Sequence, residues 1–279
     1  MQMTETGLQS GLAAALAQVE PREPGFGAGV AIARDGVLLA EAWVGEAESG
    51  RPWRHDTPIV TWSVSKGVVA MIVARLAQDG EIDLDAPIRS YWPDFGTRHC
   101  TTSLADVMTH RAGLPWLPDL PELPNFSDTS SWTGNAAAMA LAQMPPEPNF
   151  EGQVAYHALT YGWLAGECLQ QATGLGLNAQ LQKLLAGPNE LAMSFGTKDA
   201  DVRDRLARPG VPASGFEKCA AVDAALADPD NPLRRALCVP VGQGFSDVLR
   251  KTESVDFLAA ETPAISLISD ASSLARAYS

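Results

Sequence analysis

A tight-turn signal between two apolar runs constrains the fold of this chain more than any other sequence feature. Residues 28–33 and 37–44 are rich in small and β-branched apolar side chains, and Arg34-Asp35-Gly36 lies between them. An Asp-Gly pair favours the two-residue turns that join antiparallel strands, because those turns need positive φ angles that Asp and Gly tolerate. The sequence therefore predicts a β-hairpin across residues 27–45.

Helical patterns precede and follow this hairpin. Leu8, Leu12 and Leu16 recur every four residues, which predicts an amphipathic helix before the first strand. After Pro58 the apolar periodicity becomes helical, and we expect helices at 63–78, 103–110, 136–144, 159–173, 178–185 and 271–278. In the second of these, Ser103 is the expected N-cap. Helices packed on an antiparallel sheet define an α+β fold.

Two segments interrupt the helical pattern. Residues 114–132 contain Pro115, Pro118, Pro121 and Pro124, and prolines at this density exclude a regular helix. We expect a long surface loop there, of a length that often borders a functional site. Residues 209–240 are also predicted to be rich in loops.

The composition excludes several classes of partner and location. With 279 residues, 46% of them hydrophobic, the chain can build one large domain or two modest ones. Its formal net charge of −13 repels phosphate backbones and anionic membranes, so we expect no nucleic-acid and no membrane partner. The chain has no run of 18 apolar residues and no secretory signal at its N-terminus, which predicts a cytoplasmic location.

The cysteines indicate neither a disulfide framework nor a zinc cluster. Cys100, Cys168, Cys219 and Cys238 are scattered along the chain, and none forms a CxxC pair. The GxSxG, HExxH and phosphate-loop motifs are also absent from the sequence. We predict no cofactor and no metal.

The motif with the clearest chemistry is Ser63-Val64-Ser65-Lys66, an SxxK pattern. On a helix, residues i and i+3 share a face, so the Ser63 hydroxyl and the Lys66 ammonium can meet. Burial of Lys66 among valines favours the neutral amine, which can accept the serine proton. The alternative is an exposed helix with an incidental lysine. Ser65 is the competing hydroxyl, but we expect it to face elsewhere.

Three blocks of sequence resemble the serine β-lactamase and penicillin-binding-protein family. The segment 62–67 is similar to the nucleophile helix of that family, 104–114 to its "LLTHTSGL" segment, and 156–167 to the block in which its catalytic tyrosine precedes a helix. The blocks occur in the family's order, and the resemblance covers about 27–196, with weaker similarity as far as Tyr278. It points in particular to class C β-lactamases and the family VIII carboxylesterases.

The resemblance implies roles for three residues. Ser63 would be the nucleophile, Lys66 its activating partner, and Tyr156 a second group that handles protons. For Tyr156 the alternative is a tyrosine that packs on the surface near the start of a helix. The implied function is a serine hydrolase that works through an acyl-enzyme on a small-molecule ester or amide, most simply a carboxylesterase on small esters. A β-lactamase, a D-aminopeptidase, an acyltransferase and a truncated, non-catalytic binding protein are the alternatives.

The sequence departs from the family pattern near Tyr156. Ala158 stands where lactamases carry the asparagine of a YxN motif, and the loss of that amide favours an esterase over a lactamase. His157 can contact substrate or be structural. His110 is predicted to be structural, closing a helix where a cation or a donor suits the dipole.

The second departure concerns the end of the chain. The family's third element, KTG or HxG on a strand beside the serine, is not found, and Gly196-Thr197-Lys198 has those letters in the wrong order. We therefore expect a β-lactamase-like fold that lacks the C-terminal strands and helix. Its incomplete sheet domain would be 1–60 with 262–279, and its helical domain 61–261. Such a chain would be poorly soluble alone and would pair with a missing C-terminal segment or a second chain.

Overall fold

The predicted hairpin is present in the computed structural model, as strands β1 (Gly27–Arg34) and β2 (Val37–Glu48). The two strands are antiparallel, and Asp35 and Gly36 form the turn with φ angles of 53° and 76°. A short strand β3 (Arg51–Pro52) extends this sheet in the order β1-β2-β3. The structure describes residues 5–19, 25–96, 101–118, 120, 122–126, 129–132, 134–150, 152–208 and 220–279.

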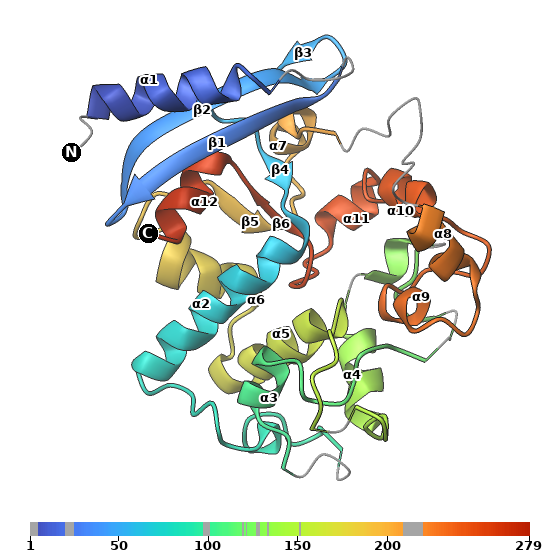
Figure 1. The fold of residues 1–279 in the computed structure, drawn as a ribbon. Coiled ribbons are helices and arrows are strands. Elements are labelled where there is room, and N and C mark those ends of the chain that lie inside the picture. The colour runs from blue at the N-terminus through green and yellow to red at the C-terminus, as the bar shows by residue number, and fades with distance from the viewer. Residues whose placement is uncertain are drawn as a thin grey trace.

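Helices α1 (Glu5–Leu16) and α12 (Ala271–Ala277) lie on the two sides of the hairpin (Figure 1). Both were expected from the sequence. The side chain of Gln9 in α1 donates to the Glu41 carbonyl at 2.7 Å and accepts from the Glu41 N–H at 3.1 Å. Since one amide satisfies both main-chain groups of a β2 residue, α1 is fixed to the strand by hydrogen bonds as well as by packing.

A second, small sheet brings together segments that lie far apart in the sequence. Strand β6 (Leu267–Ser269) pairs antiparallel with β4 (Ile59–Val60) on one side and with β5 (Met193–Phe195) on the other. None of these strands was predicted, because two or three residues are too few to show an alternating pattern. The sheet matters for function because β4 leads directly into the SxxK segment.

The SxxK segment begins as a 3₁₀ turn, η1 (Trp62–Val64), and continues as helix α2 (Ser65–Gln78). Helix α3 (Leu104–Met108) starts at the predicted cap, because the Ser103 hydroxyl accepts from the Asp106 N–H and the Asp106 carboxylate accepts from the Ser103 N–H. The expected helices at 136–144, 159–173 and 178–185 correspond to α4 (Ala136–Gln143), α5 (Thr160–Thr173), and α6 (Leu177–Leu181) continued by the π-helical η5 (Gln182–Ala186).

The prediction for 209–240 was wrong in part. Helices α8 (Ala220–Ala227) and α9 (Pro232–Ala236) occupy its second half, and 209–219 lie outside the described residues. Asn231 caps α9 with Pro232 at its first position, which is a local helix-start signal. The described part of 114–132 is irregular apart from η4 (Thr129–Trp132), as expected. The prediction of a surface loop was wrong, because most of its large apolar side chains are buried in the core: Leu114, Trp116, Leu117, Leu123, Phe126 and Trp132. The remaining short elements are η2 (Ile88–Ser90), α7 (Ala200–Arg205), α10 (Phe245–Lys251) and α11 (Val255–Ala259).

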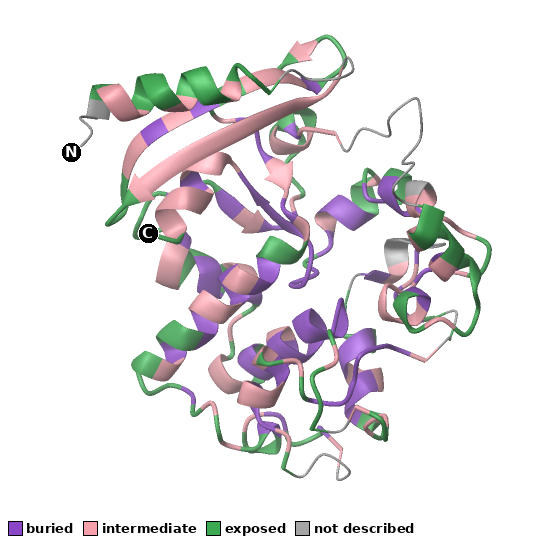
Figure 2. Cartoon of the chain, viewed as in Figure 1, coloured by how far each residue is buried: buried purple, intermediate pink, exposed green. Residues whose placement is uncertain are grey.

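The core runs through the helical part of the molecule and reaches the small sheet. Val68, Ile72 and Leu76 of α2 are buried against α5, whose Leu164 is fully buried. In Figure 2 the buried residues concentrate in α2, α5 and the β5–β6 region, whereas the outer side of α1 is exposed. This packing holds the start of α2 in a defined position. The division into two domains at 61 and 261 stays a prediction.

Candidate active site

The SxxK segment brings a serine hydroxyl and a lysine amine together. Ser63 lies in η1 and is exposed, whereas the side chain of Lys66 in the first turn of α2 is buried, with 7% of the residue exposed. Lys66 Nζ lies 3.2 Å from Ser63 Oγ, within hydrogen-bonding distance. The structure therefore places the predicted i, i+3 pair in contact.

The surroundings of Lys66 favour its neutral amine. Burial lowers the pKa of Lys66 from 10.5 to about 8. Its second hydrogen bond goes to the Ala264 carbonyl at 3.1 Å, and its ammonium lies 5.1 Å from the centre of the Tyr156 ring. None of these groups is a carboxylate that would hold the charge. A lysine in this setting can take up a proton from a neighbouring hydroxyl near neutral pH.

The turn that carries Ser63 is held in an unusual backbone conformation. Trp62, directly before Ser63, has φ of 51°, which costs a bulky residue about 1–3 kcal/mol. Thr61 fixes this turn by donating to the Leu267 carbonyl from its N–H at 2.8 Å and from its hydroxyl at 3.1 Å. Strand β6 therefore stabilises the strained turn and fixes the direction in which the Ser63 side chain points.

Ser65 is part of this scaffold. It is fully buried, its hydroxyl donates to the Trp62 carbonyl, and it accepts from the Leu267 N–H at 3.0 Å. The expectation that Ser65 faces away from the site agrees with this geometry. The Ser65 hydroxyl thus connects the Trp62 carbonyl, at the start of the nucleophile turn, to the Leu267 N–H of β6.

Tyr156 lies beside Lys66, in the irregular segment that precedes α5. Its side chain is 53% exposed, and its ring centre lies 4.8 Å from that of His110. The Lys66 amine is thus close to both the Ser63 hydroxyl and the Tyr156 ring. The chemical role of the phenol stays a prediction.

His157 and His110 brace the loop that carries Tyr156. His157 is fully buried; its Nε2 accepts from the Leu114 N–H at 3.1 Å and its Nδ1 donates to the Ala155 carbonyl at 2.5 Å. Burial is the main cause that lowers its pKa to about 4, so the ring is neutral. This geometry favours the structural alternative for His157 over substrate binding, because both ring nitrogens already have protein partners.

His110 is not the cation or donor that its place at the end of a helix suggested, because its ring nitrogen accepts a hydrogen bond. Its Nδ1 accepts from the His157 N–H at 3.1 Å, and burial together with the nearby Lys66 charge lowers its pKa. A neutral ring that accepts a hydrogen bond fits these surroundings better than a cation. The structure thus favours a structural role for His110, in which its ring accepts a hydrogen bond from the His157 N–H in the segment before α5.

Two residues of α5 position Lys66 and were missed in the sequence. The hydroxyl of Tyr161, a residue that is 2% exposed, donates to the Lys66 carbonyl at 3.1 Å, and its pKa is raised chiefly by burial. Gly162 lies so close to the 263–264 backbone that a Cβ atom would stand 2.4 Å from Ala264 N. A lone tyrosine and a helical glycine carry no sequence signal for these contacts.

The described residues place no KTG-like strand beside Ser63. In Gly196-Thr197-Lys198, the Gly196 N–H donates to the Ser266 carbonyl at 2.9 Å and the Thr197 N–H donates to the Leu258 carbonyl at 2.5 Å. These N–H groups are therefore already used in packing beside β6. The main-chain group that contacts Lys66 is the Ala264 carbonyl, which accepts a hydrogen bond and cannot donate one as the N–H of a KTG strand would.

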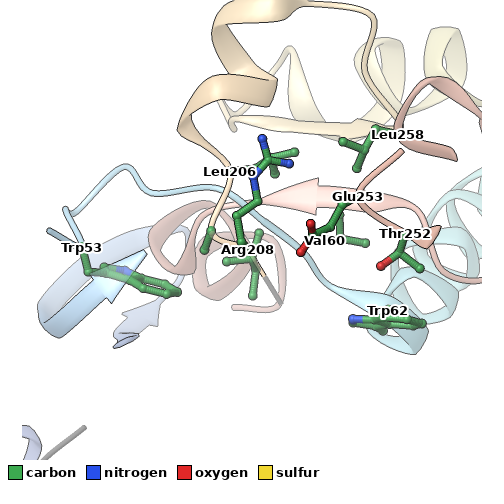
Figure 3. A pocket seen from close by; sticks show the side chains of 10 residues that line it. Trp53, Val60, Trp62, Leu206, Arg208, Thr252, Glu253 and Leu258 are labelled. Carbon is green, nitrogen blue, oxygen red and sulfur yellow. The ribbon is translucent and has the colours of Figure 1, made fainter. Parts of the chain in front are cut away.

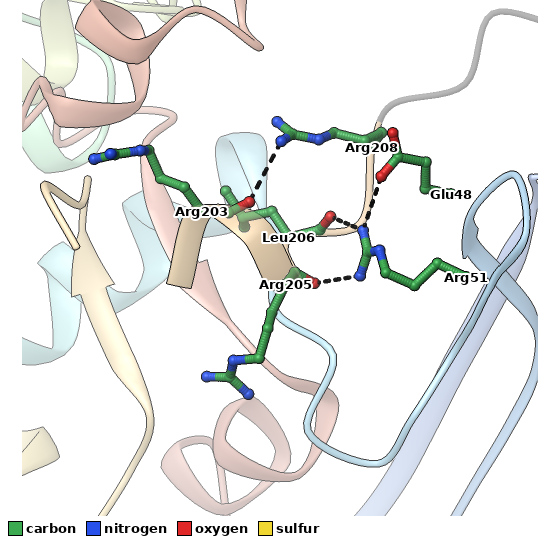
Figure 4. Close-up of polar contacts among 6 residues, drawn as sticks. All are labelled: Glu48, Arg51, Arg203, Arg205, Leu206 and Arg208. Carbon is green, nitrogen blue, oxygen red and sulfur yellow. Dashed lines mark hydrogen bonds and ion pairs between the residues drawn. The ribbon is translucent and has the colours of Figure 1, made fainter. Parts of the chain in front are cut away.

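A cavity of about 250 Å³ borders the nucleophile turn at Trp62 (Figure 3). Trp53 and Trp62 stand at its two ends, and Arg208 reaches in from the segment after α7. Arg51 fixes this wall, since its guanidinium donates to the Leu206 carbonyl at 2.5 Å and to the Arg205 carbonyl at 2.8 Å (Figure 4). Most residues that line the cavity are apolar, and Arg208, Thr252 and Glu253 are its polar members.

Metal and thiol chemistry have little support in the described part of the chain. Its His, Cys, Asp and Glu residues form no group of three or more that could hold a metal ion. Burial, with a smaller effect of Glu167, raises the pKa of the Cys168 thiol to about 12, which makes it unreactive. Cys100 and Cys219 lie outside the described residues. Within the described residues, no helix is both long and apolar enough to cross a membrane.

An antiparallel sheet flanked by helices, with an SxxK serine and lysine at the start of a buried helix, defines a chain of the serine β-lactamase and penicillin-binding type. The family model described as Beta-lactamase matches residues 16–279, and the chain belongs to this family. The resemblance that the three sequence blocks suggested is confirmed.

Curated relatives and solved structures agree with this assignment. Esterase/beta-lactamase LipL of Mycobacterium tuberculosis is 33% identical over 187 residues, and the match covers 65% of this chain and 42% of the relative. Esterase EstB of Burkholderia gladioli is 31% identical over 181 residues, which are 58% of this chain and 45% of the relative. A family VIII carboxylesterase superposes with a TM-score of 0.72 at 26% identity, over 95% of this chain and 66% of that chain. The chain thus spans less than half the length of the curated relatives that it matches.

Proposed function

We propose that this chain acts as a serine hydrolase that forms an acyl-enzyme on Ser63 and cleaves small carboxylic esters. The observation that carries the proposal is the 3.2 Å contact between Lys66 Nζ and Ser63 Oγ. A buried amine with a pKa of about 8 is a suitable base for a serine hydroxyl, because about a tenth of it is neutral at pH 7, far more than of an ordinary lysine.

In the proposed acylation, Lys66 accepts the Ser63 proton while Ser63 Oγ attacks the ester carbonyl carbon. In this scheme the Ser63 N–H, a main-chain group in η1, stabilises the developing oxyanion. The C–O bond to the alcohol then breaks, and the alcohol leaves with a proton returned from Lys66, directly or through Tyr156. Attack by water, with the same groups moving protons, releases the acid and restores Ser63.

Tyr156 supports the proton transfers in this scheme. Its ring lies against the Lys66 ammonium, with 5.1 Å from Nζ to the ring centre, and its exposed side chain can reach a leaving group. The phenol is therefore the proposed second group that passes a proton between Lys66 and the substrate. His157 has no proton-transfer role in the proposal.

An ester is the favoured substrate, and a β-lactam is the second candidate. EstB is named an esterase and LipL an esterase/beta-lactamase, so both reactions occur in the names of relatives. Ala158, which is buried, offers no amide to hold a lactam side chain. We expect kcat/KM for p-nitrophenyl butyrate to exceed that for a chromogenic cephalosporin; the reverse order would favour the lactamase. No feature of the described site favours D-amino-acid amide hydrolysis or acyl transfer over ester hydrolysis.

Labelling with a fluorophosphonate probe tests the proposal. Mass spectrometry of the modified peptide should find the probe on Ser63, and Ser63→Ala should abolish both labelling and ester hydrolysis. Ser49→Ala, which changes another exposed serine at the far end of β2, is the matched control and should label normally. Labelling elsewhere, or full activity in Ser63→Ala, would show that Ser63 is not the nucleophile. Absence of all labelling would favour the non-catalytic alternative.

A further inference from the structure

Gly67 follows Lys66 in the first turn of α2, and the backbone there does not require a glycine. Its φ is not positive, and alanine favours a helix over glycine by about 1 kcal/mol. The space around it explains the glycine. A Cβ atom added at Gly67 would collide with the Tyr278 hydroxyl and would lie 3.0 Å from Tyr278 Cζ. The hydroxyl of Tyr278, which follows α12, therefore occupies the space of a side chain at position 67.

The peptide that joins Lys66 to Gly67 is contacted by two tyrosines. Its carbonyl, which belongs to Lys66, accepts from the Tyr161 hydroxyl of α5 at 3.1 Å. Its other end, Gly67 Cα, lies against the Tyr278 hydroxyl. The pKa of Tyr161 is raised chiefly by burial and in smaller part by the Tyr278 phenol, which agrees with the two tyrosines lying near one another. Because the atoms of a peptide form one plane, the two phenols restrain the same unit of the backbone.

The end of α12 that carries Tyr278 is itself fixed to other parts of the molecule. Arg276 donates to the Gly36 carbonyl of the hairpin turn at 3.0 Å and to the Asn189 carbonyl, in the turn before β5, at 2.7 Å. These two bonds hold the last turn of α12 against the hairpin. The contact between Tyr278 and Gly67 therefore connects the hairpin to the helix that follows the nucleophile turn.

The position of this peptide matters for the chemistry because the Lys66 amine must reach Ser63. The distance from Nζ to Oγ is 3.2 Å, at the long end of the range for a hydrogen bond, so a small shift of the Lys66 main chain breaks the contact. An amine that leaves this position also gains water, and hydration favours its charged form. A restraint on the main chain at Lys66 therefore acts on both the reach and the proton affinity of the amine.

We propose that Tyr278 is a positioning residue: by resting against Gly67 it keeps the Lys66 amine beside the serine hydroxyl. The proposal rests on the proposed function and deepens it, because it concerns the base of the same site. The titratable side chains that face this amine are Tyr156, Tyr161 and His110, and the variants of the test leave all three unchanged.

An exchange of volume between positions 67 and 278 tests the proposal. Gly67→Ala displaces the Tyr278 ring and should raise the pH midpoint of Ser63 labelling by about 0.5–1 unit, which lowers the rate at pH 7 about 3–10-fold. Adding Tyr278→Phe replaces the lost hydroxyl by the new methyl group and should restore most of the rate. The nearest ring atom is then 3.0 Å from the new Cβ, and the exposed ring can move by the few tenths of an ångström required.

Gly176→Ala is the matched control, because a Cβ at Gly176 meets open space, and it should keep the wild-type midpoint. A wild-type midpoint in Gly67→Ala would overturn the proposal. A double variant that labels as slowly as Gly67→Ala would also overturn it, because the loss would then belong to α2 alone and not to the contact with Tyr278.

A measurement on Lys66 itself separates the positioning role from the proposed function. In protein that carries ¹³C-labelled lysine, the Lys66 Cε resonance is identified by its loss in Lys66→Met. In the Ser63→Ala background it should titrate near pH 8, at higher pH when Gly67→Ala is added, and near pH 8 again when Tyr278→Phe is added as well. The same titration in all three proteins would refute the role of Tyr278 whatever the activity. If the resonance responds as expected but no probe labels Ser63, the proposed function fails and the positioning role stands.

Discussion

Replacing Lys66 by Met should remove the reactivity of Ser63 and at the same time stabilise the fold. Burial lowers the pKa of this lysine from 10.5 to about 8. One pKa unit corresponds to about 1.4 kcal/mol, so the charged, buried ammonium lowers the free energy of unfolding at neutral pH by roughly 3 kcal/mol. Methionine keeps most of the side-chain volume without the charge. Part of the gain is offset, because the Ala264 carbonyl loses its donor, a cost of about 1–2 kcal/mol. We expect a net stabilisation on the order of 1–2 kcal/mol at pH 7.

The pH dependence has a defined sign. Between pH 8 and 10.5 the unfolded chain binds more protons at Lys66 than the folded chain, so the stability of the wild type rises with pH across this window. Below pH 8 the buried ammonium destabilises the folded state to its full extent. The gain in the free energy of unfolding on Lys66→Met should therefore shrink as the pH approaches 10. The rate of Ser63 labelling should rise with pH as Lys66 loses its proton, with a midpoint near 8.

Two assays check this reasoning. Urea unfolding of the wild type and Lys66→Met at pH 7 and pH 10 gives the free energy of unfolding, and stopped-flow labelling with a fluorophosphonate gives the rate profile. Arg75→Met in the same helix removes an exposed cation and is the control, expected to change stability little. Destabilisation by Lys66→Met at pH 7, or a labelling midpoint near 10, would refute the account of a desolvated lysine.

Three further substitutions probe the groups around the site. Tyr156→Phe should lower kcat about 10²-fold with a smaller change in KM, as loss of a proton-transfer group does; wild-type kcat would return the residue to a packing role. Ser65→Ala should retain most Ser63 labelling but lose about 1–3 kcal/mol in chemical denaturation, because the buried Leu267 N–H loses its acceptor; an unchanged midpoint would contradict this. Gly162→Ala should slow labelling of Ser63 and lower the melting temperature, since a Cβ 2.4 Å from Ala264 N displaces the turn before β6 whose Ala264 carbonyl contacts Lys66. Gly176→Ala, with open space at its Cβ, is the control and should label at the wild-type rate, whereas Gly174 has a positive φ of 70° and is unsuitable as a control.

The parts of the fold that the sequence predicted are those with local causes. The hairpin follows from Asp35-Gly36, whose positive φ angles set the turn, and the start of α3 follows from the Ser103 cap. The Ser63–Lys66 contact was predictable for the same reason, since three residues of helix bring the two side chains together. Tyr156 was identified as a site residue only through the family resemblance, because the residues around it in the sequence do not indicate that it lies near Lys66.

The parts that could not be predicted depend on contacts across the length of the chain. The Ala264 carbonyl that receives the Lys66 bond is 198 residues away, and the Leu267 N–H that binds Ser65 is 202 residues away. Strands of two or three residues carry too short a pattern to reveal such pairings. For the same reason the sequence could not show the positive φ of Trp62, which only the surrounding contacts make tolerable.

These long-range contacts have a consequence for how the site forms. The helical part of the SxxK segment has local causes, but the strained turn at Trp62 is favourable only when β6 accepts the bonds from Thr61 and donates to Ser65. Strand β6 in turn is paired with β5, so the Ser63 turn depends on three segments at once. Because no local force holds a tryptophan at φ of 51°, the direction of the Ser63 hydroxyl is a property of the packed structure and not of the motif. An SxxK sequence in a peptide would therefore bring Ser and Lys to one helix face without the fixed turn that a nucleophile needs.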